Sequence, residues 1–149
     1  MYYYAYDEFV TDTKTLVKQC EPFQADALIA IIRGGLTLGQ AFAHAIDSRA
    51  LYTINSILYE GKERGESCDI FNMPDLSKAS KVLLLDDIID SGKTIKEVLH
   101  QLQTCYPEVE FKIASLFYKK SAVIQPDFAV KEATEWIEFF WEKDFLVEA

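Results

Sequence analysis

The sequence predicts an α/β fold, in which a central parallel sheet is covered by helices. Two continuous apolar runs, Ala27–Ile32 and Val82–Leu85, have the length and composition of strands that are buried on both faces. Helix-forming segments follow these runs, and such alternation of strand with helix is typical of parallel sheets. The chain has 149 residues, half of them apolar, and no linker-like or repetitive tract. We therefore expect a single domain that spans residues 1–149.

The first half of the chain begins with a short edge strand, expected at Tyr2–Tyr6, and a helix from Asp7 whose apolar side chains fall on one face. The strand Ala27–Ile32 is broken by Arg33-Gly34-Gly35, after which an alanine-rich helix is expected at Leu36–Ile46. The remaining expected elements are, in order, a strand at 51–58, a long polar loop at 59–80, a strand at 82–85, a helix at 94–105 and strands at 111–118 and 128–130.

Composition excludes several classes of function. The net charge of −9 disfavours binding to nucleic acid or to an anionic membrane. Arg33 interrupts the longest apolar region, so we expect no membrane span, and the first residues lack the features of a signal peptide. The three cysteines are widely spaced, without a Cys-x-x-Cys pair, which argues against a disulfide framework or a zinc site. A reducing, cytoplasmic location is expected.

The most informative stretch is KVLLLDDIIDSGKT, residues 81–94, whose last three residues match the close of a nucleotide-binding P-loop. A P-loop requires a glycine five residues before its Gly-Lys pair, so that the backbone wraps around the phosphates. Asp87 stands at that position, next to a second acid, Asp86. The P-loop interpretation therefore fails on both geometry and charge.

The same stretch divides into two halves with different chemistry. The second half enters a helix, where free N–H groups, a glycine and hydroxyl side chains form a site for one phosphate; its residues are Asp90, Ser91, Gly92, Lys93 and Thr94. Asp86 and Asp87 lie at the strand end, and paired carboxylates there suit two sugar hydroxyls or a Mg²⁺ ion. A phosphate on one side and a diol or metal on the other describe a ribose 5-phosphate.

Residues 81–94 closely resemble the 5-phosphoribosyl-1-pyrophosphate (PRPP) motif of type I phosphoribosyltransferases. Two further stretches resemble the bacterial xanthine-guanine members of that family: IIRGGL, residues 31–36, is similar to their pyrophosphate loop, and WIEFFWE, residues 136–142, to their purine-pocket segment. The resemblance runs from about residue 27 to residue 142. It implies the type I phosphoribosyltransferase fold, a central parallel sheet flanked by helices with a small C-terminal hood region, together with Mg²⁺ as cofactor, held by Asp87, and a homodimer or homotetramer.

The resemblance assigns pyrophosphate to Arg33, Gly34 and Gly35, where a guanidinium and freed N–H groups would meet the anion. The alternative is a surface arginine beside turn glycines. The family loop carries a non-proline cis peptide, which we place at Arg33–Gly34. In the polar region from Asn55 to Ser80 we expect a mobile lid, with Lys62 and Arg64 as candidates to reach pyrophosphate, although solvated charge is the default explanation for both.

For the base, the resemblance points to Lys119, whose ammonium group would donate to a purine 6-oxo group, with Lys120 as an alternative because the proline usual at that position is absent. Trp136 would stack on the purine, and backbone carbonyls at Trp136 and Ile137 would accept from a 2-amino group. Helical core packing is the competing explanation. Asp90 is the candidate general acid/base near N7 of the purine, unless it only caps the following helix.

These assignments predict a purine salvage enzyme that joins PRPP to guanine, xanthine or hypoxanthine, without ranking the three bases. Two alternatives remain: a phosphoribosyltransferase for adenine or a pyrimidine, and a non-enzymatic PRPP-sensing regulator. Lys119 and Trp136 argue against the first, and the negative net charge and the lack of spare length for a further domain argue against the second.

Overall fold

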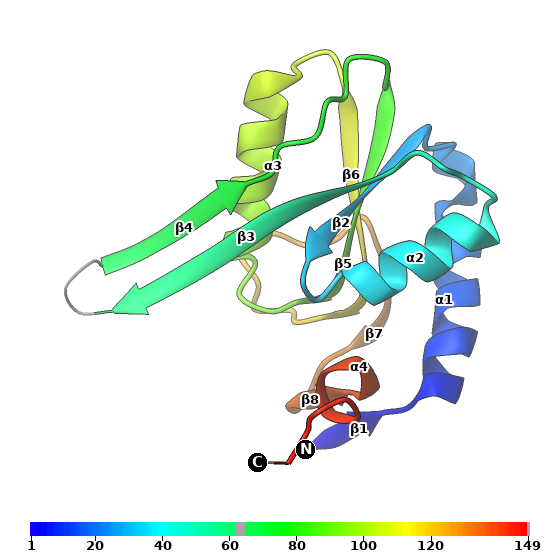
Figure 1. The fold of residues 1–149 in the computed structure, drawn as a ribbon, viewed down its shortest axis with the longest axis vertical. Coiled ribbons are helices and arrows are strands. Elements are labelled where there is room, and N and C mark those ends of the chain that lie inside the picture. Colours follow the sequence, from blue (N-terminus) through cyan, green and yellow to red (C-terminus); the bar gives the residue numbers. More distant parts are fainter. Residues whose placement is uncertain (62–64, 149) are drawn as a thin grey trace.

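The computed structural model describes residues 1–61 and 65–148 and confirms the α/β prediction (Figure 1). In chain order, its elements are β1 (Tyr2–Tyr4), α1 (Tyr6–Cys20), the 3₁₀ turn η1 (Glu21–Phe23), β2 (Ala27–Ile32), α2 (Leu36–Ala45), β3 (Leu51–Gly61), β4 (Gly65–Phe71), β5 (Lys81–Ile89), α3 (Lys93–Cys105), β6 (Glu110–Tyr118), β7 (Phe128–Glu132), β8 (Ile137–Phe139) and α4 (Phe140–Lys143). None of the helices in the described part of the chain has the length and hydropathy that crossing a membrane requires.

The main sheet has six strands in the order β4-β3-β2-β5-β6-β7. All neighbours pair in parallel except β3 and β4, which form an antiparallel hairpin that projects away from the body of the molecule (Figure 1). The central strands β2 and β5 are buried on both faces, as their apolar runs predict, and their carboxyl ends define one edge of the sheet.

Side chains alternate along the central strands between two apolar cores. On β5, Leu83 and Leu85 belong to the core on the α1 and α2 side, whereas Val82 and Leu84 belong to the core that contains the buried face of α3. This alternation follows from the two-residue repeat of a strand, and β2 shows it too, so both layers of helices pack on these two central strands.

Three strand predictions need correction. The strand expected to end at Leu85 continues as β5 through both acids to Ile89, because it keeps pairing with β6, with Asp86 opposite Ser115 and Ile89 opposite Tyr118. Part of the polar region expected to be a loop at 59–80 instead extends β3 to Gly61 and supplies β4, because cross-strand pairing satisfies the backbone even where apolar periodicity is weak, whereas residues 72–80 form a loop as expected.

The third correction concerns the N-terminal strand. Tyr2–Tyr4 does not join an edge of the main sheet but pairs in parallel with β8, from almost the other end of the chain. The resulting unit of β1, β8 and α4, here called the hood, lies beside both termini (Figure 1). It therefore contains an N-terminal strand as well as the C-terminal residues that the resemblance implied.

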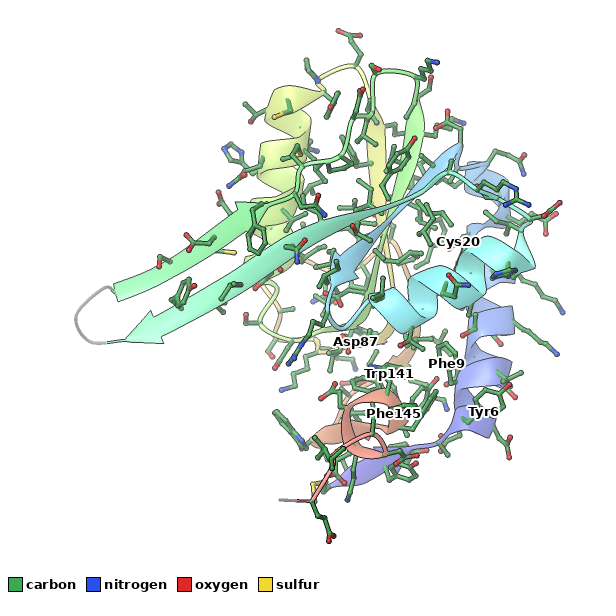
Figure 2. The ribbon with its side chains drawn as sticks, in the orientation of Figure 1. Tyr6, Phe9, Cys20, Asp87, Trp141 and Phe145 are labelled. Atoms are coloured by element: carbon green, nitrogen blue, oxygen red, sulfur yellow. The ribbon has the colours of Figure 1, made fainter. Side chains whose placement is uncertain are left out.

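Aromatic rings attach the hood to the body of the molecule. Tyr4 meets Phe117 of β6 edge to face, with 5.0 Å between ring centroids. Phe9 of α1 and Trp141 of α4 lie side by side (Figure 2), with 5.2 Å between their centroids. Phe139 and Trp141 stack on each other within the hood, with 4.7 Å between centroids. Edge-to-face and offset stacked geometries are the favourable ones for aromatic pairs, so this cluster fixes the hood by specific contacts as well as by apolar burial.

Candidate functional site

Two adjacent carboxylates, Asp86 and Asp87, lie near the carboxyl end of β5. Figure 2 shows Asp87 on the side of the molecule that faces the hood. Asp87 is 7% exposed and Asp86 is partly buried. Each carboxylate accepts one backbone N–H: Asp86 from Asp87 at 2.9 Å, and Asp87 from Ile88 at 2.7 Å. Both side chains are thus held in place while most of their acceptor capacity remains unused by these bonds.

Burial raises the pKa of both carboxyl groups. For Asp86, loss of hydration is the main cause, and the neighbouring charge of Asp87 adds to it. For Asp87, loss of hydration raises the pKa to about 6, against an ordinary value of 3.8, and the charge of Glu142 acts in the same direction. A pair of acids with raised pKa values is a place where a cation or a hydroxyl donor is favourable.

The loop after β2 packs directly on this acid pair. A Cβ atom at Gly34 would lie 2.6 Å from Oδ2 of Asp87, so only glycine allows the loop backbone to approach so closely. A Cβ at Gly35 would collide with the carbonyl oxygen of Leu85 in β5. Both glycines are therefore required by close packing, and they bring the Arg33 loop and the acid pair to one place.

The cis peptide bond in this loop joins Ile32 to Arg33, one bond earlier than the predicted Arg33–Gly34 position. Arg33 is exposed, and its positive charge lowers the pKa of Glu142 of α4, although burial raises that pKa overall. The charge of Arg33, in the loop after β2, therefore affects the ionisation of a residue in the hood.

A second part of the site is the turn into α3. Gly92 is the N-cap residue, and its φ of 81° lies in the left-handed region that favours glycine. A Cβ there would also crowd the backbone of Ile124 at 3.1 Å. The N-cap residue Gly92 has no side chain with which to cap the helix, and the N–H of Lys93 donates to the hydroxyl oxygen of Ser91 at 3.3 Å, not to Asp90. A hollow whose lining includes Asp90, Ser91, Gly92 and Thr94 opens at the helix N-terminus. Such a position suits an anion.

Asp90 pairs with Lys119, with 2.7 Å between the carboxylate and Nζ. Lys119 follows β6, and its N–H donates to the carbonyl oxygen of Ile89 at 2.9 Å. This bond places the lysine next to the turn between β5 and α3, here called the acidic turn because it contains Asp90. Lys120 points elsewhere and pairs with Glu132 at 3.5 Å. Between the two lysines that the sequence left open, only Lys119 reaches the acidic turn.

A second hollow lies between this turn and the hood. Its lining residues are Ile88, Asp90, Lys119, Glu135, Trp136, Ile137, Phe139 and Glu142. It contains Lys119, Trp136 and Ile137, the three residues predicted to bind a base, and it shares Ile88 and Asp90 with the hollow at α3. Trp136 is 69% exposed, so its indole face is open to a ligand rather than packed in the core.

The backbone of the hood differs from the prediction in one respect. The carbonyl oxygen of Trp136 already accepts the N–H of Tyr2 at 2.8 Å, which leaves one of its two lone pairs for a ligand. Glu142 was not among the site residues predicted from the sequence. It lines the second hollow and interacts electrostatically with Asp87 and Arg33. It is the last residue of the WIEFFWE segment, whose resemblance to the family's purine pocket was the signal that could have identified it.

Most of the predicted site residues therefore meet at one edge of the sheet: the Arg33 loop, the acid pair, the α3 turn, Lys119 and the start of β8. Lys62 and Arg64, predicted for a mobile lid, lie outside the described residues.

Comparisons with known proteins agree with this arrangement. The phosphoribosyl transferase domain family matches residues 8–146. The xanthine-guanine phosphoribosyltransferase of Ruegeria sp. (strain TM1040) is 26% identical, over 95% of this chain and 85% of its own length. The solved Helicobacter pylori xanthine-guanine-hypoxanthine phosphoribosyltransferase is 39% identical with a TM-score of 0.91, over 96% of this chain and 94% of its own. A purine phosphoribosyltransferase from Pyrococcus horikoshii is 27% identical with a TM-score of 0.84, over 99% and 97%.

The raised pKa of Asp87 predicts that the substitution Asp87→Asn stabilises the ligand-free protein at neutral pH. In the folded wild type the pKa is about 6, above the ordinary value of 3.8, so stability is lost as the pH rises through this interval. Asparagine does not titrate and keeps an acceptor for the N–H of Ile88. We expect a gain of up to about 3 kcal/mol in the free energy of unfolding at pH 7.5, shrinking towards zero near pH 4.

Urea unfolding across this pH range, in buffer free of divalent cations, measures the difference. Asp75→Asn is the matched control, because a hydrogen bond from the Ser77 N–H lowers the pKa of Asp75, so its substitution should bring no gain. Equal stability of wild type and Asp87→Asn at pH 7.5 would show that the buried acid carries no such cost.

Proposed function

Because the chain belongs to the phosphoribosyl transferase domain family, in its bacterial xanthine-guanine group, we propose that it transfers the 5-phosphoribosyl group of PRPP to a 6-oxopurine in purine salvage. The products are a purine nucleoside monophosphate and pyrophosphate. Guanine, xanthine and hypoxanthine are the candidate bases, in keeping with the names of the relatives.

The observation that carries this proposal is the meeting of two hollows at Asp90. One hollow lies at the N-terminus of α3 and suits a phosphate; the other lies under the hood, with an indole face and an ammonium group in its walls. A ligand that fills both must place its middle part at Asp90, near Asp86, which also lines the hollow at α3. A ribose with phosphate at one end and a purine at the other has this layout.

On the phosphate side, the 5-phosphate would lie in the turn formed by Asp90, Ser91, Gly92, Lys93 and Thr94. Gly92 lets the backbone approach the anion, while Ser91 and Thr94 offer hydroxyl groups and the helix dipole adds favourable potential. Asp86 and Asp87 would accept hydrogen bonds from the ribose hydroxyls.

The acid pair also fits the Mg²⁺ ion that the family implies. Asp87 and Asp86 are neighbouring oxygen donors with raised pKa values, which a nearby divalent cation would lower again. No cluster of three or more His, Cys, Asp or Glu side chains forms a metal site in the described residues, and a magnesium ion does not need one, since it is commonly held by one or two carboxylates plus substrate oxygens and water. When bound, the ion would neutralise pyrophosphate charge.

Pyrophosphate would lie on the loop of Arg33, Gly34 and Gly35. The guanidinium group of Arg33 would pair with its oxygens, and the two glycines keep the loop backbone against the acid pair. As the bond from ribose C1 to the pyrophosphate oxygen breaks, positive charge builds on the sugar. The nearby carboxylates favour that charge, so the acids help at the moment when the anion leaves.

On the base side, Lys119 would donate to the 6-oxo group, because an ammonium group donates to a carbonyl oxygen and repels an exocyclic amine. This favours 6-oxopurines over adenine. Trp136 offers its exposed indole face for stacking, and the backbone at Trp136 and Ile137 offers acceptors for a 2-amino group.

Asp90 is proposed as the general acid/base that takes the proton the purine loses when its nitrogen bonds to ribose C1. Its position between the two hollows supports this role, as does the pairing with Lys119, which keeps the carboxylate near the base.

The two alternatives derived from the sequence gain no support from the relatives described above, which are named for xanthine, guanine, hypoxanthine or purine. We propose further that residues 1–149 act as one catalytic domain, that the protein works in the cytoplasm, and that it forms a homodimer or homotetramer, as the resemblance implies.

The first test is an assay of the purified protein with PRPP, Mg²⁺ and one base at a time. Guanine, xanthine or hypoxanthine should each be tried for nucleoside monophosphate formation and pyrophosphate release, with adenine and orotate as controls. We expect turnover with at least one 6-oxopurine, none with the controls, and loss of activity when EDTA removes divalent cations. Turnover confined to adenine or orotate would contradict the proposed base, and PRPP binding without any pyrophosphate release would favour a regulator.

The role of Lys119 is tested by Lys119→Met. Loss of a charged hydrogen bond to the base should lower kcat/KM for the 6-oxopurine by about 10- to 100-fold. Lys120→Met removes a lysine from the next position, which pairs with Glu132 instead, and should stay within about twofold of wild type. A larger loss in Lys120→Met than in Lys119→Met would reverse the assignment.

Asp90→Asn keeps the size of the side chain and removes its ability to take a proton. We expect kcat to fall by about 10² to 10⁴-fold. Asp47→Asn, at an exposed position after α2, is the matched control. Near-normal turnover in Asp90→Asn would leave Asp90 a binding role only.

A further inference from the structure

Five side chains outside the proposed site tie the hood to the body of the molecule. They come from β1, α1 and β7, and are here called the tyrosine clamp: Tyr2, Tyr4, Glu8, Asp12 and Lys131. The aromatic cluster packs the hood against the core, whereas the clamp is directional, since each hydroxyl group has one defined acceptor.

The clamp depends on a match between the repeats of a strand and a helix. Tyr4 donates its hydroxyl hydrogen to Oδ2 of Asp12 at 2.7 Å, and Tyr2 donates to Glu8. Tyrosines two apart lie on one face of β1, about 6.6 Å from each other, and acids four apart lie on one face of α1, about 6 Å apart. Because the two spacings agree, both bonds form in the same register, and sliding β1 along α1 would break both.

Lys131 of β7 completes the clamp. Its ammonium group lies 3.0 Å from Asp12 and 3.5 Å from Glu8. Asp12 is 5% exposed, and a buried carboxylate without a partner would be costly, so the lysine makes burial of this acid tolerable. Burial acts to lower the pKa of Lys131, but the hydrogen bond to Asp12 and the charge of both acids outweigh it and raise the pKa. The lysine is therefore held as a cation.

From the clamp, β1 leads directly to the hollow between the α3 turn and the hood, here called the base hollow. The N–H of Tyr2 donates to the carbonyl oxygen of Trp136 at 2.8 Å, and Tyr2 and Tyr4 stand opposite Ile137 and Phe139 in the β1–β8 register. Trp136, Ile137 and Phe139 line that hollow. The hollow at the N-terminus of α3, here called the phosphate hollow, is formed by the end of β5 and the start of α3. Neither of these segments contains a clamp residue.

We propose that Asp12 is a positioning residue for purine recognition, acting through the Tyr4 hydroxyl group to hold β1 and, by strand pairing, the β8 wall of the base hollow. This inference rests on the proposed function and deepens it. Asp12 touches no substrate. Its loss would let β8 shift relative to Lys119, which is fixed on the main sheet, so base binding would weaken while PRPP binding would not.

Tyr4→Phe is the most selective test, because it removes the hydroxyl group and keeps the ring that packs on Phe117 and Phe139. We expect KM for the purine base to rise roughly fivefold to tenfold, with KM for PRPP within about twofold of wild type. Tyr3→Phe is the matched control on the same strand. Its hydroxyl group bonds Asp144 at 2.7 Å, near the C-terminus, and not α1, so neither KM should change.

A direct binding measurement supports the kinetics. Both tryptophans of the chain, Trp136 and Trp141, flank β8, so a titration with guanosine monophosphate followed by tryptophan fluorescence reports on the hood. Tyr4→Phe should bind this nucleotide more weakly than Tyr3→Phe does. Lys131→Met should act in the same direction as Tyr4→Phe, and Lys131→Arg should restore most of the affinity, since it keeps a cation beside Asp12.

The outcomes separate the two levels of inference. A wild-type protein that releases no pyrophosphate with any base would overturn the proposed function, and this inference with it. An active wild type whose Tyr4→Phe variant leaves both KM values unchanged, raises them equally or only lowers kcat would overturn the clamp alone. Because Tyr4→Phe deletes a single oxygen atom, it decides the matter even if Lys131→Met does not fold.

Discussion

Burial of Asp86 beside Asp87 raises the pKa of both carboxyl groups, so the ligand-free fold carries an electrostatic cost that the packing around β5 must offset. The position is central, since the same strand supplies Val82, Leu83, Leu84 and Leu85 to the cores on both faces of the sheet. A strand held so firmly can keep two acids at its end where a less buried element would turn them towards water. The rest of the site is arranged around that pair, and a cation or sugar hydroxyls would relieve the cost.

Close backbone approach is the second requirement, and it follows from the first. Gly34 lies against the carboxylate of Asp87, and Gly92 turns the chain into α3, whose first residues line one hollow together with Asp86. Negative side chains and an anion-binding helix end are thus neighbours without occupying the same space. The transferred group fits this division, because its phosphate is anionic and its ribose offers hydroxyl groups and develops positive charge during transfer.

The base side is built differently, from segments that are far apart in the chain. Lys119 comes from the main sheet, whereas Trp136 and Ile137 belong to the hood, so the shape of the base hollow depends on how the hood is attached. Aromatic contacts such as that of Phe9 with Trp141 attach the hood to the body of the molecule, and the hydrogen bonds of the tyrosine clamp set the register of β1 against α1. The ammonium group of Lys119 pairs with Asp90, which keeps both groups at the junction of the two hollows.

The sequence by itself determined the α/β class, the buried strand Ala27–Ile32 at its observed bounds and the residues of the acidic turn, because apolar runs and a dense local motif act over short distances. Only the tertiary structure decided what depends on contacts between distant residues. The pairing of β1 with β8, the continuation of β5 through Asp87, the ion pair of Asp90 with Lys119 and not with Lys120, and the presence of Glu142 in the hollow beside the hood are of this kind. Local propensity does not encode which strand a tyrosine-rich segment will join or which lysine will face an acid, since these outcomes follow from how the folded elements pack.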